Sequence, residues 1–284
     1  MILFKKNKSK KPLLWSNSPI KRLTTKFSNL RPGRSTFNGQ ITVRHKCSRS
    51  FAVSSRLVNK RIFELRAEFG QVIRLERNPN GSSFLALIRL LRSGFLSYIN
   101  APSNLKIGSF IAINPNSFDS LFFKRLRINS VALPLYKIPK GSYICNIEKS
   151  FLSGPSFCKG AGTKAKLQSV SVRSGLVSLL MPSGKTQYLP LTAHAFTGIM
   201  SNSQHQLYKF YKAGQRIVLG NRPSVRGVAM NPVDHPHGGG EGKTSGGRPS
   251  VTPWGFLIKG FKTRSKNTSK KFLKLKTKFL SSSL

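Results

Sequence analysis

Glycine and proline are concentrated in residues 225–255, and this stretch restricts the fold more than any other part of the chain. Glycine leaves the backbone with maximal freedom and proline removes a hydrogen-bond donor, so neither a long helix nor a central strand fits here. We therefore expect an irregular loop, which cannot bury its own polar backbone and needs a partner to order it. The cations Arg226, Lys243 and Arg248 indicate that this partner is anionic.

The same loop contains partial signatures of other sites. The run Gly-Lys-Thr at 242–244 resembles the end of a phosphate-binding Walker loop, but the position that must be glycine is His237. Asp234, His235 and His237 are of metal-ligand types, yet the three cysteines are distant and form no Cys-x-x-Cys pair. A general base at His235 beside Asp234 stays open as an alternative, which would make the chain a nucleic-acid-processing enzyme.

Acidic residues are nearly absent from the chain. Its 284 residues include 49 Lys and Arg against 7 Asp and Glu, which gives a formal net charge of +42. A polyanion relieves this self-repulsion and releases counterions on binding, so nucleic acid is the expected partner. The scattered acids supply no second carboxylate motif for an enzyme. Because no helix-turn-helix or zinc-finger spacing is present, DNA is not the favoured nucleic acid.

Both ends of the chain are basic and free of acids. Residues 1–36 form a predicted basic arm, whose prolines interrupt any amphipathic presequence helix, and residues 259–284 form a basic tail. We expect RNA to order both segments. The odd, unpatterned cysteines favour free thiols in a reducing compartment, and the longest apolar runs are too short for a membrane span.

Short alternating runs separated by turn residues predict a mostly β protein. In residues 37–118 the sequence Asn-Pro-Asn-Gly at 78–81 separates two such runs, 71–77 and 84–90, and a further turn leads to 95–99. A small closed barrel would remove the open edges of this meander. Residues 119–131 are a predicted linker.

A second strand-rich unit is predicted in residues 132–200, with hairpins between 168 and 189. Its glycine-rich basic loop, 159–166, is a candidate for bringing backbone amides close to phosphates, and the alternative is a simple flexible hairpin. Residues 194–200 and 206–213 are expected as short helices or turns. An extended C-terminal region, 201–284, follows.

The longest motif resembles one family. Residues 231–242 read Asn-Pro-Val-Asp-His-Pro-His-Gly-Gly-Gly-Glu-Gly, with Arg-Pro-Ser-Val-Arg-Gly before them at 222–227 and Val-Thr-Pro-Trp-Gly after them at 251–255. This run resembles the signature of the universal large-subunit ribosomal protein of the L-two family, in its bacterial or organellar form. The resemblance extends upstream to 39–45, 105–108 and 133–142.

The resemblance implies a fold and a function. It implies an OB-fold at 37–118, an SH3-like barrel at 132–200 and an rRNA-binding loop at 222–255. The chain would then be a structural constituent of the large ribosomal subunit that binds its rRNA, touches neighbouring ribosomal proteins and the small subunit, and supports the peptidyl transferase centre, subunit association and tRNA binding. The chemistry of that centre is attributed to RNA, so we expect no catalytic residue and no cofactor except Mg²⁺ shared with rRNA.

The resemblance also carries site residues onto this chain. For His235 we favour a role in positioning RNA, because the glycines permit close backbone approach and the motif lacks a nucleophile. Trp254 is expected to pack or to stack on a base. Residues 46–49 read Lys-Cys-Ser-Arg where the family usually has a glycine-rich stretch. The predicted rRNA-binding residues are Arg44, His45, Lys159, Lys164, Lys166, Arg222, Arg226, Asn231, Asp234, His235, His237, Gly238, Gly239, Gly240, Glu241, Lys243, Arg248, Trp254, Lys259, Lys262 and Arg264.

The composition also bears on localisation. Lys, Asn, Phe, Ile and Ser are abundant, which suggests an AT-rich organellar gene. Together with the acid-free termini and the expected free thiols, this favours the mitochondrial matrix, with the plastid as the alternative.

Overall fold

The computed structural model describes residues 22–24, 33–35, 37–46, 56–59, 68–115, 128–242, 244, 247–260, 275, 277 and 281. The chain divides into two compact units, one of Met1–Lys26, Ser54–Lys209 and Leu273–Leu284 and the other of Phe27–Val53 and Phe210–Phe272. Most of the predicted arm and tail, and most of the predicted linker, lie outside the described residues. None of the helices that the structure describes is long and apolar enough to cross a membrane.

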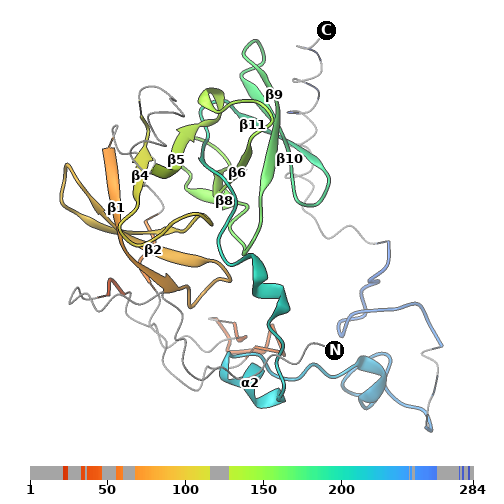
Figure 1. Ribbon diagram of the computed structural model, residues 1–284. Helices are drawn as coiled ribbons and strands as arrows, with labels where there is room; N and C mark the ends of the chain where they lie inside the picture. Colours follow the sequence, from red (N-terminus) through yellow and green to blue (C-terminus); the bar gives the residue numbers. More distant parts are fainter. Residues whose placement is uncertain are drawn as a thin grey trace, which may run out of the picture. The chain divides into compact units, whose positions relative to one another are not determined.

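The first unit begins with a meander of antiparallel strands (Figure 1). Its strands are β1 (Glu68–Arg77), β2 (Phe84–Leu90), β3 (Leu96–Asn100) and β4 (Phe110–Ile113). β1 pairs with β2 and β4, and β2 pairs with β3. Every second residue of β1 is buried, because alternate side chains point to the same face. Asn78 closes the first turn, since its Oδ1 accepts the Asn80 amide at 2.9 Å. The predicted hairpins between 71 and 99 are confirmed.

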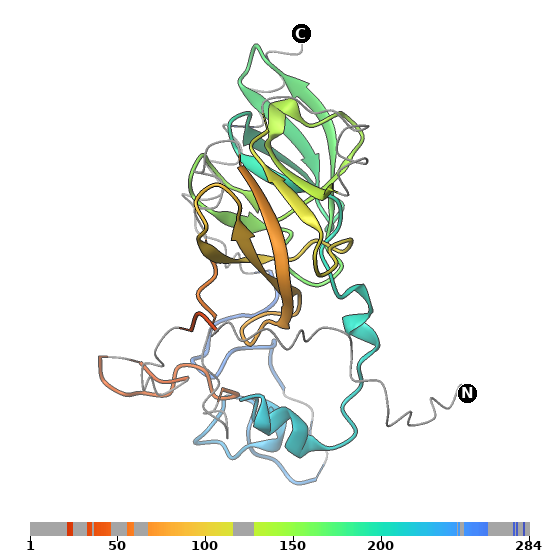
Figure 2. The same cartoon turned by 60° about the vertical axis from the view of Figure 1, so that its left-hand side comes forward.

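Strand β5 (Ile128–Pro134) pairs in parallel with β4, and a short 3-10 turn, η2 (Leu135–Lys137), follows it. The strand begins within the predicted linker 119–131. The prediction missed it because local turn signals do not report the pairing of β5 with β4. The pairing makes one ten-stranded sheet, in the order β11-β10-β9-β6-β12-β5-β4-β1-β2-β3 (Figure 1, Figure 2). The predicted OB-fold and SH3-like halves therefore share a sheet.

The second half of this unit contains seven short strands. They are β6 (Tyr143–Cys145), β7 (Ile147–Glu148), β8 (Pro155–Phe157), β9 (Ala165–Ser171), β10 (Leu176–Leu180), β11 (Thr186–Pro190) and β12 (His194–Thr197). β9, β10 and β11 form the two predicted hairpins. The expectation of a helix or turn at 194–200 was wrong for β12, which pairs with β5 and β6. Because its first three residues are all buried, the strand lacks the polar alternation that marks a half-exposed one.

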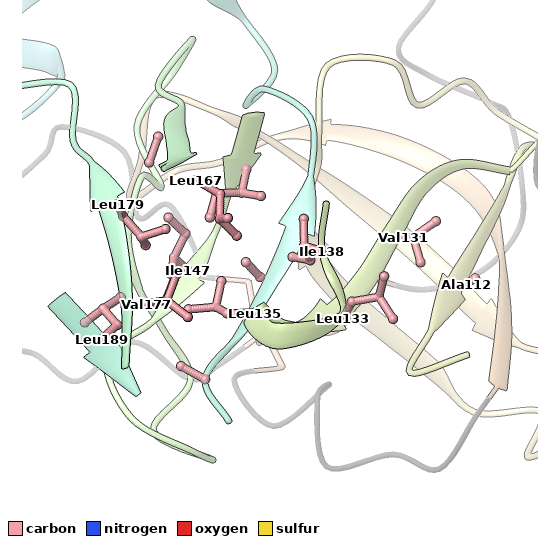
Figure 3. Close-up of a cluster of buried hydrophobic side chains, with 14 residues drawn as sticks. Ala112, Val131, Leu133, Leu135, Ile138, Ile147, Leu167, Val177, Leu179 and Leu189 are labelled. Atoms are coloured by element: carbon pink, nitrogen blue, oxygen red, sulfur yellow. The ribbon is translucent and has the colours of Figure 1, made fainter. Parts of the chain in front are cut away.

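Two apolar clusters fill the two halves. One contains Leu133, Leu135, Ile147, Leu167, Val177, Leu179 and Leu189 (Figure 3). The other contains Val72, Ile88, Ile99, Ile111 and Ile113. Each cluster also includes side chains from the other half. Ala112 of β4 packs in the first cluster, while Cys145 of β6 and Phe196 of β12 pack in the second. A buried hydrogen bond of 2.8 Å from Asn100 Nδ2 to Asn146 Oδ1 also joins the halves.

Three carboxylates of this unit are used inside it. Glu76 accepts hydrogen bonds from Arg74 Nε at 2.7 Å, Tyr98 Oη at 2.6 Å and Arg56 Nε at 2.7 Å. Burial disfavours the charge of Glu76, but the hydrogen bonds from Tyr98 and Arg56 and the charge of Arg74 outweigh it and lower its pKa.

The other two carboxylates bind backbone amides. Glu68 Oε1 accepts the amides of Arg92 at 3.0 Å and Ser93 at 2.9 Å. The fully buried Glu148 accepts those of Gly154 at 2.9 Å and His194 at 3.2 Å. Every acid that the structure describes in this unit is thus buried and engaged, so its described outer surface presents cations without compensating anions.

The second unit has almost no core. Its described residues include a short helix, α2 (Ala213–Val218), and a 3-10 turn, η4 (Gly227–Ala229). Within its described residues, only Gly220, His235 and Val251 are buried. Large apolar side chains lie exposed instead, namely Phe37, Tyr211, Val225, Val233, Trp254, Phe256, Leu257 and Ile258. Because so little apolar surface of the described residues is removed from water, hydrophobic packing contributes little to the order of this unit.

Residues 37–46 belong to this second unit and not to the β-sheet unit. The amide of Arg222 donates to the carbonyl of His45 at 2.8 Å. Lys46 forms a bridge with Asn221, and its Nζ donates to Asn221 Oδ1 at 3.2 Å. The predicted OB-fold segment 37–118 therefore begins, in the structure, with residues that pair with the C-terminal region. The sequence at 37–46 could not reveal this, because the partner is far away along the chain.

Candidate nucleic-acid interface

The glycine-rich loop is irregular, as predicted, and folds upon itself. After η4 (Gly227–Ala229), the carbonyl of Asn231 accepts the amides of Asp234 at 3.0 Å and His235 at 3.3 Å. The amide of Gly238 then donates to the carbonyl of His235 at 2.8 Å. These short-range bonds satisfy part of the loop backbone without any helix or ladder.

Two imidazoles hold the loop together. His235 is 8% exposed, and its Nδ1 accepts the backbone amide of His237 at 3.0 Å. The two rings stack with centroids 5.1 Å apart and planes at 22°. Removal from water, the charge of His237 and the charge of Arg44 all lower the pKa of His235. The ring is therefore neutral near pH 7, as its acceptor role at Nδ1 requires.

His237 ties this turn to the next segment of the loop. Its Nε2 accepts the amide of Val251 at 2.9 Å, and Val251 forms a bridge with Leu257. A neutral ring that accepts at Nε2 carries its proton on Nδ1. That buried Nδ1 has no hydrogen-bond partner among the described residues. The hydrogen bonds from the Val251 amide to His237 and from the His237 amide to His235 thus fix the shape of the loop.

Two glycines are required by this packing. A Cβ built on Gly227 would lie 2.5 Å from Cε1 of His235, 2.6 Å from Nδ1 and 2.7 Å from Nε2. A Cβ on Gly238 would collide with the carbonyl of Asn231. The glycines were predicted to let the backbone approach RNA, whereas at these two positions they let the loop approach itself.

The geometry gives no support to a general base at His235. Its Nδ1 accepts the amide of His237, and the described residues include no hydrogen bond between the His235 ring and the exposed carboxylate of Asp234. A catalytic base needs an accessible acceptor nitrogen and a partner that orients it. The arrangement instead makes His235 a positioning residue for the loop.

The cations predicted around this loop point outward. Arg44, His45, Arg222, Arg226, Arg248 and Lys259 are exposed, as are Asn231, Asp234, Gly240, Glu241 and Trp254. His237, Gly238 and Gly239 are half-buried, and His235 is buried. The Trp254 side chain is 64% exposed, so its ring offers a free apolar face. Lys243, Lys262 and Arg264 lie outside the described residues.

The loop at 159–166 differs from the expectation that its amides bind phosphate. The amide of Ala161 donates to Ser82 Oγ at 3.0 Å, that of Gly162 to the Ser201 carbonyl at 3.2 Å, and that of Thr163 to the Gly160 carbonyl at 3.2 Å. These amides brace the sheet and are not free for an anion. Lys159, Lys164 and Lys166 nevertheless remain exposed.

The part of the chain that the structure describes contains neither a metal-binding site nor a reactive thiol. No group of three or more His, Cys, Asp or Glu there could hold a metal ion. Cys145 and Cys158 are free thiols, and burial raises the pKa of Cys158 to about 11, so thiolate is scarce at neutral pH.

Comparison with known proteins decides the family. The family of ribosomal proteins L2, C-terminal domain, matches residues 129–255. The large ribosomal subunit protein uL2m of Reclinomonas americana is 42% identical over 92% of this chain and 89% of its own length. The chain belongs to the uL2 family.

Bacterial uL2 proteins are similarly close. The uL2 of Neorickettsia sennetsu is 41% identical over 93% of this chain and 91% of its own length, and that of Rickettsia typhi is 39% identical over 93% and 92%. Membership of the uL2 family confirms the resemblance inferred from the 231–242 motif. Sequence reasoning missed Gly227 and Val251 as partners of the two histidines, because these contacts depend on the folded loop and not on spacing.

Proposed function

We propose that this chain is a structural constituent of the large ribosomal subunit that binds its rRNA and has no catalytic role of its own. The observation that carries the proposal is the second unit, which exposes cations and aromatic rings and buries almost nothing. Only a large anionic partner supplies both the charge and the packing that such a unit lacks. The names of the relatives agree with this role.

The loop and its cations suggest how rRNA is held. Arg222, Arg226 and Arg248 would meet phosphates, while Trp254 would stack on a base. The imidazole pair would keep residues 227–251 in one shape, so that binding costs less conformational entropy. By resemblance to the family, this loop supports the peptidyl transferase centre, subunit association and tRNA binding, and the only metal we expect is Mg²⁺ held by the rRNA.

An enzyme acting on nucleic acid is the rival function. The described residues do not bring acids and histidines together in the way that such an enzyme requires. The three described acids of the sheet unit are buried and engaged, and the free carboxylates of the loop are not joined to the His235 ring. The role proposed here needs neither a nucleophile nor a metal. Neighbouring ribosomal proteins and the small subunit are its expected protein partners.

We further propose that this large subunit is that of a mitochondrial ribosome in the matrix, with the plastid as the alternative. The composition and the uL2m relative favour this, while the bacterial relatives are almost as similar. Fractionation of the source cells, followed by detection of the chain in organellar large subunits, would test the compartment.

Binding to RNA tests the function directly. The full chain, mixed with large-subunit rRNA and with unrelated RNA of equal length, should prefer the rRNA. Its binding constant should fall by about 0.7 to 0.9 logarithmic units per phosphate contact for each tenfold rise in salt concentration. The RNA should be recovered intact in the presence of Mg²⁺. Equal affinity for both RNAs, or cleavage products that appear with the protein, would overturn the proposal.

A further inference from the structure

An exposed tyrosine lies within a cluster of lysines on the outer face of β6 and β9. Tyr143 begins β6 and is 45% exposed, and its register partner in β9 is Lys166. The Nζ of Lys164 lies 4.0 Å from the centroid of the Tyr143 ring. Lys166 in β9 is exposed while Ala165 before it is buried, and Lys164, which directly precedes β9, is also exposed. We call Tyr143, Lys164 and Lys166 the Tyr143 cluster.

The backbone fixes this cluster rigidly. The carbonyl of Tyr143 accepts the amide of Gly198 at 2.8 Å. The preceding turn is tied to β9 on both sides, because the amide of Leu167 donates to the Ser142 carbonyl at 3.1 Å and that of Gly141 to the Leu167 carbonyl at 2.8 Å. A ring on a paired strand loses little freedom when it binds a flat partner.

No acidic side chain that the structure describes forms an ion pair with Lys164 or Lys166. Glu148, the described acid nearest in sequence to Tyr143, is fully buried and takes the amides of Gly154 and His194. The cation–π contact places the ammonium of Lys164 over the ring, so that cation and aromatic face are presented together. An exposed ring flanked by two exposed cations is complementary to a nucleotide, whose base stacks and whose phosphates pair with ammonium groups.

We propose that the Tyr143 cluster binds one unpaired nucleotide of the large-subunit rRNA, with its base against Tyr143 and its flanking phosphates on Lys164 and Lys166. This inference rests on the proposed rRNA-binding function and adds the class of ligand at this site, which is single-stranded RNA. A base within a duplex presents only its edge and cannot stack on a side chain, so the ligand must be unpaired. Duplex RNA would engage the lysines alone.

Photocrosslinking from position 143 tests the site locally. The full chain carrying p-benzoylphenylalanine at position 143 is assembled into large subunits and irradiated, and the crosslinked nucleotide is mapped. The expected result is a crosslink to unpaired rRNA. Position 172 is the control, because Val172 is 80% exposed in the turn that follows β9, at the opposite end of that strand from Lys166. Crosslinks from 143 to protein only, to paired nucleotides, or no more often than from 172 would overturn the inference.

Affinity measurements separate the roles of ring and lysines. Tyr143→Leu should weaken binding of the full chain to large-subunit rRNA by about 5- to 150-fold, the usual effect of losing one stacked base, while leaving the salt slope unchanged. Tyr143→Phe should bind normally, since stacking does not need the hydroxyl. Lys164→Ala with Lys166→Ala should reduce the salt slope by about 1.4 to 1.8 units.

A matched substitution keeps the test specific. Tyr136 is also an exposed tyrosine of this unit, but its nearby cation, Lys137, lies 5.9 Å from the ring. Tyr136→Leu should have little effect, and an equal loss in both variants would show that exposed rings contribute without a defined site. If the wild-type chain binds rRNA but Tyr143→Leu binds as tightly, only this inference fails. If the wild-type chain shows no preference for rRNA, the proposed function fails as well.

Discussion

Substitution of Gly227 by alanine should disorder the rRNA-binding loop without harming the β-sheet unit. Gly227 has no positive φ, so alanine suits its backbone, and the effect arises only from the side chain. The new Cβ would lie 2.5 to 2.7 Å from three atoms of the His235 ring, whereas ordinary contacts begin near 3.4 Å. The ring must therefore retreat by about 0.7 to 0.9 Å.

The cost follows from the bonds that the ring makes. The hydrogen bond from the His237 amide to His235 Nδ1 is 3.0 Å long, and a retreat of this size breaks it. A half-buried amide left unpaired costs about 1 to 3 kcal/mol. The ratio of ordered to disordered loop in the free chain should fall by about 5- to 150-fold, and the apparent affinity for rRNA should fall as the ordered fraction falls.

Three measurements check this reasoning. Hydrogen exchange at the His237 and Val251 amides should accelerate, incorporation into large subunits on a gradient should decrease, and the Tm of the sheet unit should stay constant. Gly214→Ala is the matched control, because nothing lies within 4 Å of its Cβ and it sits in helix α2 (Ala213–Val218). Combined with His235→Ala, the Gly227 substitution should add little. If Gly227→Ala exchanges and assembles like Gly214→Ala, the packing argument is refuted.

Other predictions follow from the same sites. His235→Gln should retain most of the single-turnover rate of peptidyl transfer across pH on assembled ribosomes, while His235→Ala should impair assembly; a Gln variant that assembles but loses a titrating step would establish acid–base catalysis. Because folding lowers the pKa of His235, its contribution to loop order is fully present when the pH is above the ordinary histidine pKa of about 6.5. The contribution should fade as the pH falls below that value, which hydrogen exchange at the His237 amide would measure. Replacing Lys274, Lys276 and Lys278 by alanine should reduce the salt slope of rRNA binding by about 2 to 3 units, and an unchanged slope would show that these lysines do not meet phosphates. In the RNA-free chain, trypsin should cut first in residues 1–36 and 259–284, and resistance there would contradict the RNA-ordered tails.

Local signals were sufficient for the hairpins of the fold. The turn at Asn78 and the alternation in β1 and β9 depend on neighbouring residues, so periodicity and turn chemistry locate them. Strand β12 and the parallel pairing of β4 with β5 depend on partners far along the chain, which periodicity does not report. Residues fully buried between neighbours give the same apolar run in a strand as in a turn.

The candidate site was predictable in composition but not in its internal contacts. The motif at 231–242 located the loop, and charge identified its partner class. Sequence could not show that three amides of the 159–166 loop are engaged, because two of their acceptors, Ser82 and Ser201, belong to other segments. His235 was expected to position RNA, and the contact that explains its place is instead with His237, two residues away, where a turn brings the ring back to the backbone.

The shared sheet has a mechanical consequence for the rRNA. Because β4 and β5 are hydrogen-bonded neighbours and each half contributes side chains to the core of the other, the two halves cannot swing independently. Whatever RNA segments bind to either half are held at one separation and one angle. If both halves bind rRNA, as we propose, rRNA that has folded with the wrong spacing between the two segments would engage one half but not both.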